Sequence, residues 1–165
     1  MTVPDPSATP VALGGDHAGV ELRAALRAAM EAAGHPVLDL GTHTTDSVDY
    51  PDYARRVTRA VASGEARYGV LVCGTGIGVS IAANRDPAIR CALVHDATTA
   101  RLTRQHNDAN VIALGARVVG AEVALDALRA FLTTPYEGGR HERRVAMLSP
   151  DRAAPPQNRN GGTAP

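Results

Sequence analysis

The sequence predicts an α/β protein: a Rossmann-like three-layer α/β/α fold with a five-stranded parallel sheet. Short apolar segments with the character of strands alternate with longer segments of helical periodicity. This alternation is typical of right-handed βαβ units, in which helices cover both faces of one sheet. Aromatic residues make up only 3% of the 165 residues and there is no Trp. The core must therefore be built from Val, Leu, Ile and Ala, which suits buried parallel strands under Ala-rich helices.

Five short apolar segments, each followed by glycine or polar residues, predict the strands. They cover residues 10–13, 37–40, 68–72, 90–94 and 111–114. Between them, apolar residues recur at helical spacing and predict helices over 20–33, 53–62, 79–84, 97–105, 121–132 and 140–148. Gly34 and Gly64 are placed to end the first two helices, and Asp96 is placed to cap the fourth.

These elements are expected to form one domain over residues 10–148. Residues 1–9 are predicted to be a flexible N-terminal extension, and residues 149–165, rich in Pro, Asn, Gly and Arg, a disordered tail. The first ten residues lack the basic and apolar regions of a signal peptide, and no apolar run approaches the ~20 residues of a membrane span. We therefore expect a cytoplasmic protein in which Cys73 and Cys91 are free thiols.

The charged residues exclude several classes of protein. The formal net charge is zero, so no field steers the chain toward nucleic acid or an anionic membrane, and neither is an expected partner. All 17 basic residues are Arg. A P-loop needs a Lys at the phosphates, and Schiff-base aldolases and pyridoxal enzymes need a Lys amine. These three classes are excluded.

The strongest chemical motif lies between the third strand and the helix that follows it. It consists of Cys73, Gly74, Thr75, Gly76, Ile77 and Gly78. Alternate glycines let the backbone approach a ligand closely and leave N–H groups pointing outward at a helix N-terminus, which suits an anion. The same helix end favours the thiolate form of Cys73. A small buried cysteine beside a tight turn is the structural alternative, but the adjoining loop favours a functional cysteine.

Other thiol and hydroxyl chemistries fit this loop less well. A cysteine phosphatase loop needs an Arg six positions after its Cys, where this chain has Val79. Ser80 comes close to the G-x-S-x-G pattern of a nucleophile elbow but falls inside the predicted helix. A thiol hydrolase that pairs Cys73 with His106 stays open as a weaker alternative.

Two further polar pairs lie beside predicted strands. Asp16 and His17 follow the first strand, where a charged group is costly to bury without a purpose; alternatively, Asp16 caps the next helix. His106 and Asn107 come between the fourth helix and the fifth strand. The structural alternative there is a histidine that interacts with the helix dipole, followed by an Asn-rich turn.

A basic segment lies near the end of the predicted domain. Arg140 and Arg144 are spaced to share one helical face, where two guanidinium groups suit a phosphate dianion, and Arg117 is a candidate third contact. A solvated basic helix is the structural alternative. The chain shows no compact group of His, Cys and carboxylate residues at ligand spacing, so we predict neither a metal nor an organic cofactor.

Taken together, these motifs resemble the type B ribose-5-phosphate isomerases, a family that also includes the galactose-6-phosphate isomerase subunits. The similarity runs from about Val11 to Leu148. The segments that carry it, in family order, are 16–19, 49–51, 73–78, 82–84, 106–107, 115–117 and 138–141. Each motif is weak alone, and their joint occurrence in order is highly specific.

The resemblance implies a role for each matching residue. Cys73 matches the base that moves a proton between C1 and C2 of the open-chain sugar, and His106 matches the proton donor that assists ring opening. One branch of the family places a Glu where this chain has Val79, so the chain resembles the Cys branch. Thr75 is placed to polarise the reacting oxygens. Sugar-binding positions match Asp16, His17, Tyr50, Gly74, Thr75, Gly76, Ile77, Gly78 and Asn107, and phosphate contacts match Arg117, Arg140 and Arg144.

The resemblance also implies a homodimer or tetramer whose sites are shared between subunits. Sequence order agrees, because Cys73 follows the third strand while His106 precedes the fifth, which places them at opposite edges of the sheet. Ribose 5-phosphate and ribulose 5-phosphate are the expected substrates. A related tetrose or hexose phosphate stays open, as does, from a different class, a non-catalytic module that binds sugar phosphates or nucleotides.

Overall fold

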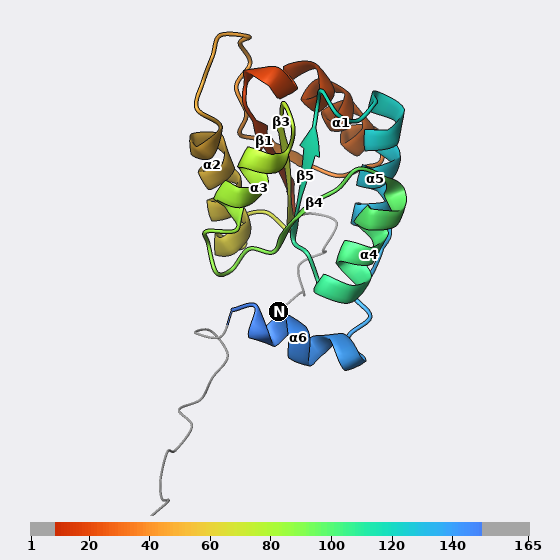
Figure 1. The fold of residues 1–165 in the computed structure, drawn as a ribbon. Helices are drawn as coiled ribbons and strands as arrows, with labels where there is room; N and C mark the ends of the chain where they lie inside the picture. The colour runs from red at the N-terminus through yellow and green to blue at the C-terminus, as the bar shows by residue number, and fades with distance from the viewer. Residues whose placement is uncertain (1–8, 150–165) are drawn as a thin grey trace, which may run out of the picture.

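A computed structural model describes residues 9–149. It contains five parallel strands: β1 (Val11–Gly15), β2 (Val37–Asp39), β3 (Tyr68–Cys73), β4 (Cys91–Leu93) and β5 (Val111–Gly115). Their order across the sheet is β2-β1-β3-β5-β4, with β3 in the centre. Because every strand runs the same way, all carboxyl ends meet at one edge of the sheet (Figure 1). The predicted parallel sheet is confirmed.

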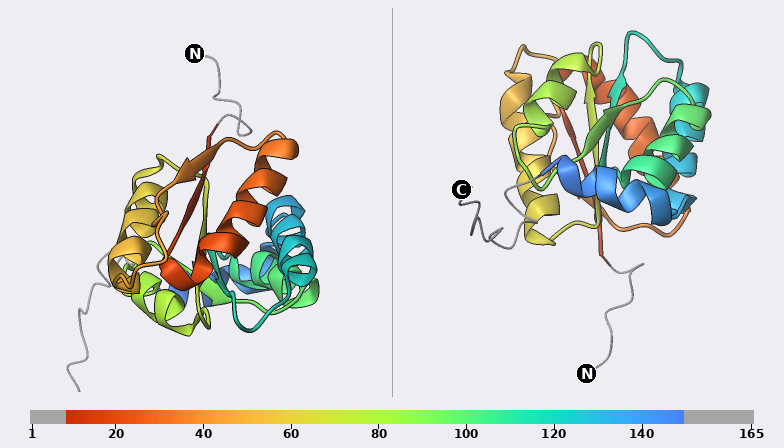
Figure 2. Two further views of the ribbon diagram at one scale, coloured as in Figure 1. Left: turned by 90° about the horizontal axis from the view of Figure 1, so that it is seen from above. Right: turned by 60° about the horizontal axis from the view of Figure 1, so that its bottom comes forward.

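Helices cover both faces of the sheet (Figures 1 and 2). Apolar side chains of α1 (Val20–Ala32), α4 (Ala97–Asn107) and α5 (Ala121–Thr133) pack with one set of strand residues, which includes Leu13 and Ile112. The helices α2 (Tyr50–Ser63) and α3 (Ile77–Ala83) pack with the alternate set, which includes Leu71 and Ala113. The predicted three-layer α/β/α arrangement follows directly from this alternation of side chains.

The bounds of several predicted helices differ from those in the structure. α2 begins at Tyr50 rather than at residue 53, because Pro51 lies in its first turn, where no N–H is needed. α3 begins at Ile77, so the last part of the glycine-rich motif is already helical. The segment predicted as one helix over 140–148 is divided into a 3-10 turn, η2 (Gly139–His141), and the short helix α6 (Glu142–Met147).

The remaining 3-10 turn, η1 (His17–Gly19), connects β1 to α1. α6 lies below the sheet in Figure 1, at the edge where the strands begin. The predictions for the terminal extension and tail fall outside the described residues except at positions 9 and 149. Between these two positions, no helix is both long and apolar enough to cross a membrane.

Candidate functional site

Cys73 is the last residue of β3 and therefore lies at the carboxyl edge, in the middle of the sheet. Its side chain is buried, and the backbone N–H of Gly76 donates a hydrogen bond to Sγ at 3.1 Å. Gly76 has φ +77°, a conformation that glycine adopts freely, and it directs the chain from this loop into α3. A donor aimed at the sulfur holds the Cys73 side chain in one orientation at the edge where ligands bind in parallel sheets.

The rest of the loop is only partly free to bind an anion. The Ile77 N–H donates to the Thr75 hydroxyl at 3.2 Å, and the Gly76 N–H is directed at Cys73. Two of the N–H groups that were predicted to point outward toward an anion therefore form hydrogen bonds inside the loop instead. The Thr75 side chain is exposed beside them.

Two other predicted residues, Asp16 and His17, reach the same edge. Asp16 is buried after β1, and its carboxylate accepts a hydrogen bond from the Ala18 N–H at 3.0 Å, so it caps η1. His17 Nδ1 accepts a hydrogen bond from the Val48 N–H at 3.2 Å, which ties the histidine to the loop between β2 and α2. This bond leaves the proton of a neutral His17 on Nε2.

Tyr50 and Arg117 border the glycine-rich loop. A Cβ atom at Gly78 would lie 2.7 Å from the Tyr50 ring, so Tyr50 packs directly on the first turn of α3. The Arg117 N–H donates to the Gly74 carbonyl at 2.9 Å, and its guanidinium approaches Gly74. Cys73, Asp16, His17, Tyr50 and Arg117 thus lie along one edge of the sheet.

A second group of predicted residues lies at the opposite edge. His106, Asn107 and Arg144 line a cavity of about 270 Å³ together with His141, Val145 and Leu148. The His106 and His141 rings stack with centroids 4.5 Å apart and planes 18° apart. The Nε–H group of Arg140 donates to His141 Nε2 at 3.4 Å. Burial, then the neighbouring His106 and Arg140, lower the pKa of His141 below its ordinary value.

The two groups do not meet within one chain. β5 starts after His106 and ends before Arg117, and its five residues span roughly 13 Å from first to last at ~3.3 Å per residue. The expectation that Cys73 and His106 lie at opposite edges of the sheet agrees with this arrangement (Figure 1). Within a single chain the sheet also separates Arg117 from Arg140 and Arg144, so a shared contact to one phosphate stays a prediction.

His106, Glu137 and His141 form a cluster that the sequence did not predict. One ligand atom from each lies within 4.8 Å of the others, and His141 Nε2 is 3.7 Å from a Glu137 carboxylate oxygen. The stacked rings fit one metal ion poorly, because an ion lies in the plane of each imidazole that binds it and these planes are nearly parallel. The adjoining Arg140 also favours an anion over a cation.

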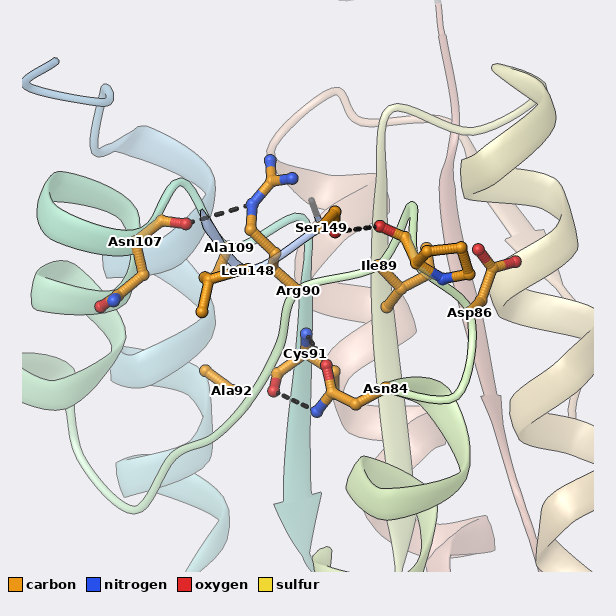
Figure 3. A pocket seen from close by; sticks show the side chains of 11 residues that line it. Asn84, Asp86, Ile89, Arg90, Cys91, Ala92, Asn107, Ala109, Leu148 and Ser149 are labelled. Atoms are coloured by element: carbon orange, nitrogen blue, oxygen red, sulfur yellow. Dashed lines mark hydrogen bonds between the residues drawn. The ribbon is translucent and has the colours of Figure 1, made fainter. Parts of the chain in front are cut away.

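Cys91 lines a separate cavity of about 340 Å³ beside the edge strand β4 (Figure 3). The Asn84 side chain accepts a hydrogen bond from the Cys91 N–H at 2.9 Å and donates one to the Cys91 carbonyl at 2.8 Å. Asn84 therefore pairs with the edge strand as a neighbouring strand would. Burial raises the pKa of Cys91 to about 12, so this thiol stays protonated and unreactive near neutral pH.

The geometry defines a Rossmann-like α/β protein with a cysteine and a glycine-rich loop at the carboxyl edge of its sheet. The family model described as Ribose/Galactose Isomerase matches residues 11–148. Ribose-5-phosphate isomerase B of Escherichia coli is 46% identical over 139 residues, which cover 84% of this chain and 93% of the relative.

Solved structures show the same relationship. Ribose-5-phosphate isomerase B of Clostridium thermocellum superimposes with a TM-score of 0.85 and 44% identity, covering 87% of this chain and 97% of that chain. The type B ribose 5-phosphate isomerase of Trypanosoma brucei gives a TM-score of 0.83 and 46% identity, covering 86% and 97%. The chain belongs to the ribose/galactose isomerase family. The resemblance inferred from the sequence motifs is confirmed.

Proposed function

We propose that the protein interconverts ribose 5-phosphate and ribulose 5-phosphate. The observation that carries the proposal is the Cys73 thiol, held at the carboxyl end of the central strand by the Gly76 N–H. A sulfur that is held in one orientation at this edge of the sheet suits a general base. The proposal is supported by relatives named ribose-5-phosphate isomerase B that are about as long as this chain's folded domain.

In the proposed reaction, Cys73 removes the proton from C2 of the open-chain aldose and returns it to C1, while the proton of the O2 hydroxyl passes to O1. The intermediate is a cis-enediolate, whose negative charge needs donors already in place. The donors proposed to stabilise this charge are the exposed Thr75 hydroxyl and those loop N–H groups that do not donate to Cys73 or Thr75. His106 donates a proton during ring opening. Asp16, His17, Tyr50 and Asn107 hold the sugar.

The complete site is proposed to form between the two subunits of a homodimer. One subunit contributes the edge that holds Cys73, and the other contributes the His106, Arg140 and Arg144 edge. Two observations support this. A single chain keeps the two groups apart, and the exposed apolar side chains of Ile77 and Ile81 project from α3 beside the Cys73 loop. A two-fold axis would supply both halves reciprocally.

Arg140 and Arg144 of one subunit, with Arg117 of the other, are proposed to bind the substrate phosphate. Binding energy from this group, remote from C1 and C2, would hold the open chain in register for proton transfer. We further propose that the reaction uses no metal and no organic cofactor, that the protein acts in the cytoplasm, and that neither nucleic acid nor membrane is a partner.

A coupled isomerase assay tests the proposal directly. Purified protein is supplied with tetrose, pentose and hexose phosphates, and kcat/KM is measured for each. The highest value is expected with ribose 5-phosphate. A higher value with a tetrose or hexose phosphate would assign the enzyme to that substrate instead, and binding without turnover of any of them would favour a non-catalytic module.

A further inference from the structure

Arg23 is a buried cation directly behind the carboxyl edge of the sheet. It belongs to α1, its side chain is only 4% exposed, and Nη1 lies 3.5 Å from an oxygen of Asp39 at the end of β2. Its Nη2 donates to the carbonyl of Thr42. Its Nε is buried without a hydrogen-bond partner among residues 9–149. A buried guanidinium is costly, so its contacts indicate what it holds in place.

The segment that Arg23 holds is the loop of residues 40–49. The loop leaves β2, passes over Arg23 at Thr42, and ends at Tyr50. A Cβ atom at Gly41 would lie 1.4 Å from Arg23 Nη1, so only glycine lets the loop approach the guanidinium this closely. The Thr42 N–H also donates to the Gly15 carbonyl at 3.3 Å.

Further along, the same loop reaches His17. The Val48 N–H donates to His17 Nδ1 at 3.2 Å, and it is the hydrogen bond that fixes this ring. A ring held at Nδ1 presents Nε2–H as its donor. We infer that Arg23 is a positioning residue, which clamps the loop of residues 40–49 so that Val48 holds His17 in its substrate-binding orientation. The inference rests on the proposed role of His17 in binding the sugar phosphate.

The chain offers a matched control on the same helix. Arg27 lies one turn beyond Arg23 and also pairs with Asp39, at 3.4 Å, but it is half-exposed and its hydrogen bonds go to Glu31 and Asp39. Asp39 keeps Arg27 and the Gly41 N–H as partners when Arg23 is removed. Arg23→Met therefore does not leave the Asp39 carboxylate without a partner. Arg27→Met removes the other arginine that pairs with Asp39 and serves as the control.

The first arm of the test measures hydrogen exchange at the Val48 amide in the protein without substrate. In Arg23→Met we expect exchange to be faster by at least about tenfold, because the loop loses its anchor. Arg27→Met should leave it unchanged. Gly41→Ala should reproduce the effect of Arg23→Met, because a methyl group displaces the guanidinium. Unchanged exchange at Val48 in Arg23→Met and Gly41→Ala would overturn the inference.

The second arm is a double-mutant cycle between Arg23 and His17. Arg23→Met should raise KM about tenfold with kcat nearly unchanged, since Cys73 is not touched. Arg23→Lys, which keeps the charge and one donor, should restore most of the affinity. In a His17→Ala background, Arg23→Met should have no further effect, because the clamp acts through His17. Additive effects of the two substitutions would overturn the inference.

The two arms separate this inference from the proposed function. A wild-type protein that turns over no sugar phosphate would refute the proposed function, whereas Val48 exchange still reports whether Arg23 holds the loop. If Arg23→Met does not fold, Gly41→Ala provides the same comparison with a smaller change. Exchange at Val48 and a KM that both match the wild type in Gly41→Ala would then overturn the inference.

Discussion

The sulfur of Cys73 accepts a hydrogen bond from the N–H group of Gly76, three residues further along the chain. The bond fixes the sulfur at the point where β3 gives way to α3, and Gly76 itself adopts a left-handed conformation there. A Cβ at Gly76 would also lie 2.6 Å from a methyl group of Leu93. The thiol is thus oriented by backbone geometry alone, before any substrate binds.

Replacement of Cys73 by Ala is expected to lower kcat by about 100- to 10,000-fold, the usual contribution of a general base. The fold and substrate affinity should change little, because the substitution removes one sulfur atom. Steady-state kinetics and a thermal melt measure both effects. Cys91→Ala is the matched control and should keep full activity. A Cys73→Ala protein with a tenth of the wild-type rate would show that another group is the base.

Iodoacetamide should inactivate the wild type through Cys73, and substrate should protect it. Cys91 should react much more slowly, because burial raises its pKa to about 12 and few molecules carry the thiolate at neutral pH. Mass spectrometry of the inactivated protein identifies the alkylated residue. Inactivation that follows modification of Cys91 instead would contradict this assignment.

Substitution of Arg140 or Arg144 by Ala is expected to reduce kcat/KM by at least ~2 kcal/mol, because each variant loses a charge-assisted contact to the phosphate dianion. Arg143, which is exposed and lies next to Arg144 in α6, provides the control, and Arg143→Ala should have little effect. The same variants should lose much less with a non-phosphorylated sugar. Equal losses on both substrates would mean that these arginines are structural.

Stability is expected to fall in mild acid because of His141. Burial lowers its pKa from the ordinary 6.5, so between the two pKa values the unfolded chain binds more protons than the folded protein. The free energy of unfolding should therefore be unaffected by this group above pH 6.5 and decline as the pH falls below it. Urea denaturation at pH 7.5 and 5.5 should show a smaller decline for His141→Asn than for wild type. His95→Gln, at an exposed position, should leave the decline unchanged.

Exhaustive chelation should leave the activity intact. The cluster of His106, Glu137 and His141 is the strongest metal-ligand arrangement in residues 9–149, yet its two rings stack rather than converge on one point. Activity is measured after dialysis against a chelator, and again after divalent ions are added back. A loss that one divalent ion restores, and that Glu137→Gln reproduces, would assign a metal to this cluster.

The elements of the fold were predictable because they depend on local periodicity. Buried strands such as β3 are continuous apolar runs, and the strand–helix alternation determines the parallel sheet. Helix starts were less predictable. A proline at position 51 indicates an end as readily as a first turn, and the packing of Tyr50 against Gly78, which accompanies the early start of α2, is a contact that no local pattern shows.

The candidate site was predictable at the carboxyl edge and much less so at the opposite edge. Cys73 and Asp16 follow strands, where ligands bind in parallel sheets. The stacking of His106 on His141 depends on how the chain turns at Gly138 and Gly139, which have φ +66° and +56°, and then passes beneath the sheet. No local pattern encodes a contact between residues 35 positions apart.

A shared site predicts that two inactive variants restore each other. Cys73→Ala and His106→Ala damage opposite edges of the sheet, so a mixed dimer carries both defects in one site and none in the other. With random exchange half of the dimers are mixed, and recovery should approach roughly a quarter of the wild-type activity. The two proteins are mixed under conditions that allow subunits to exchange, and exchange is verified separately with tagged subunits. Two Cys73→Ala preparations mixed in the same way control for the procedure. Verified exchange without recovered activity would place both residues within one subunit.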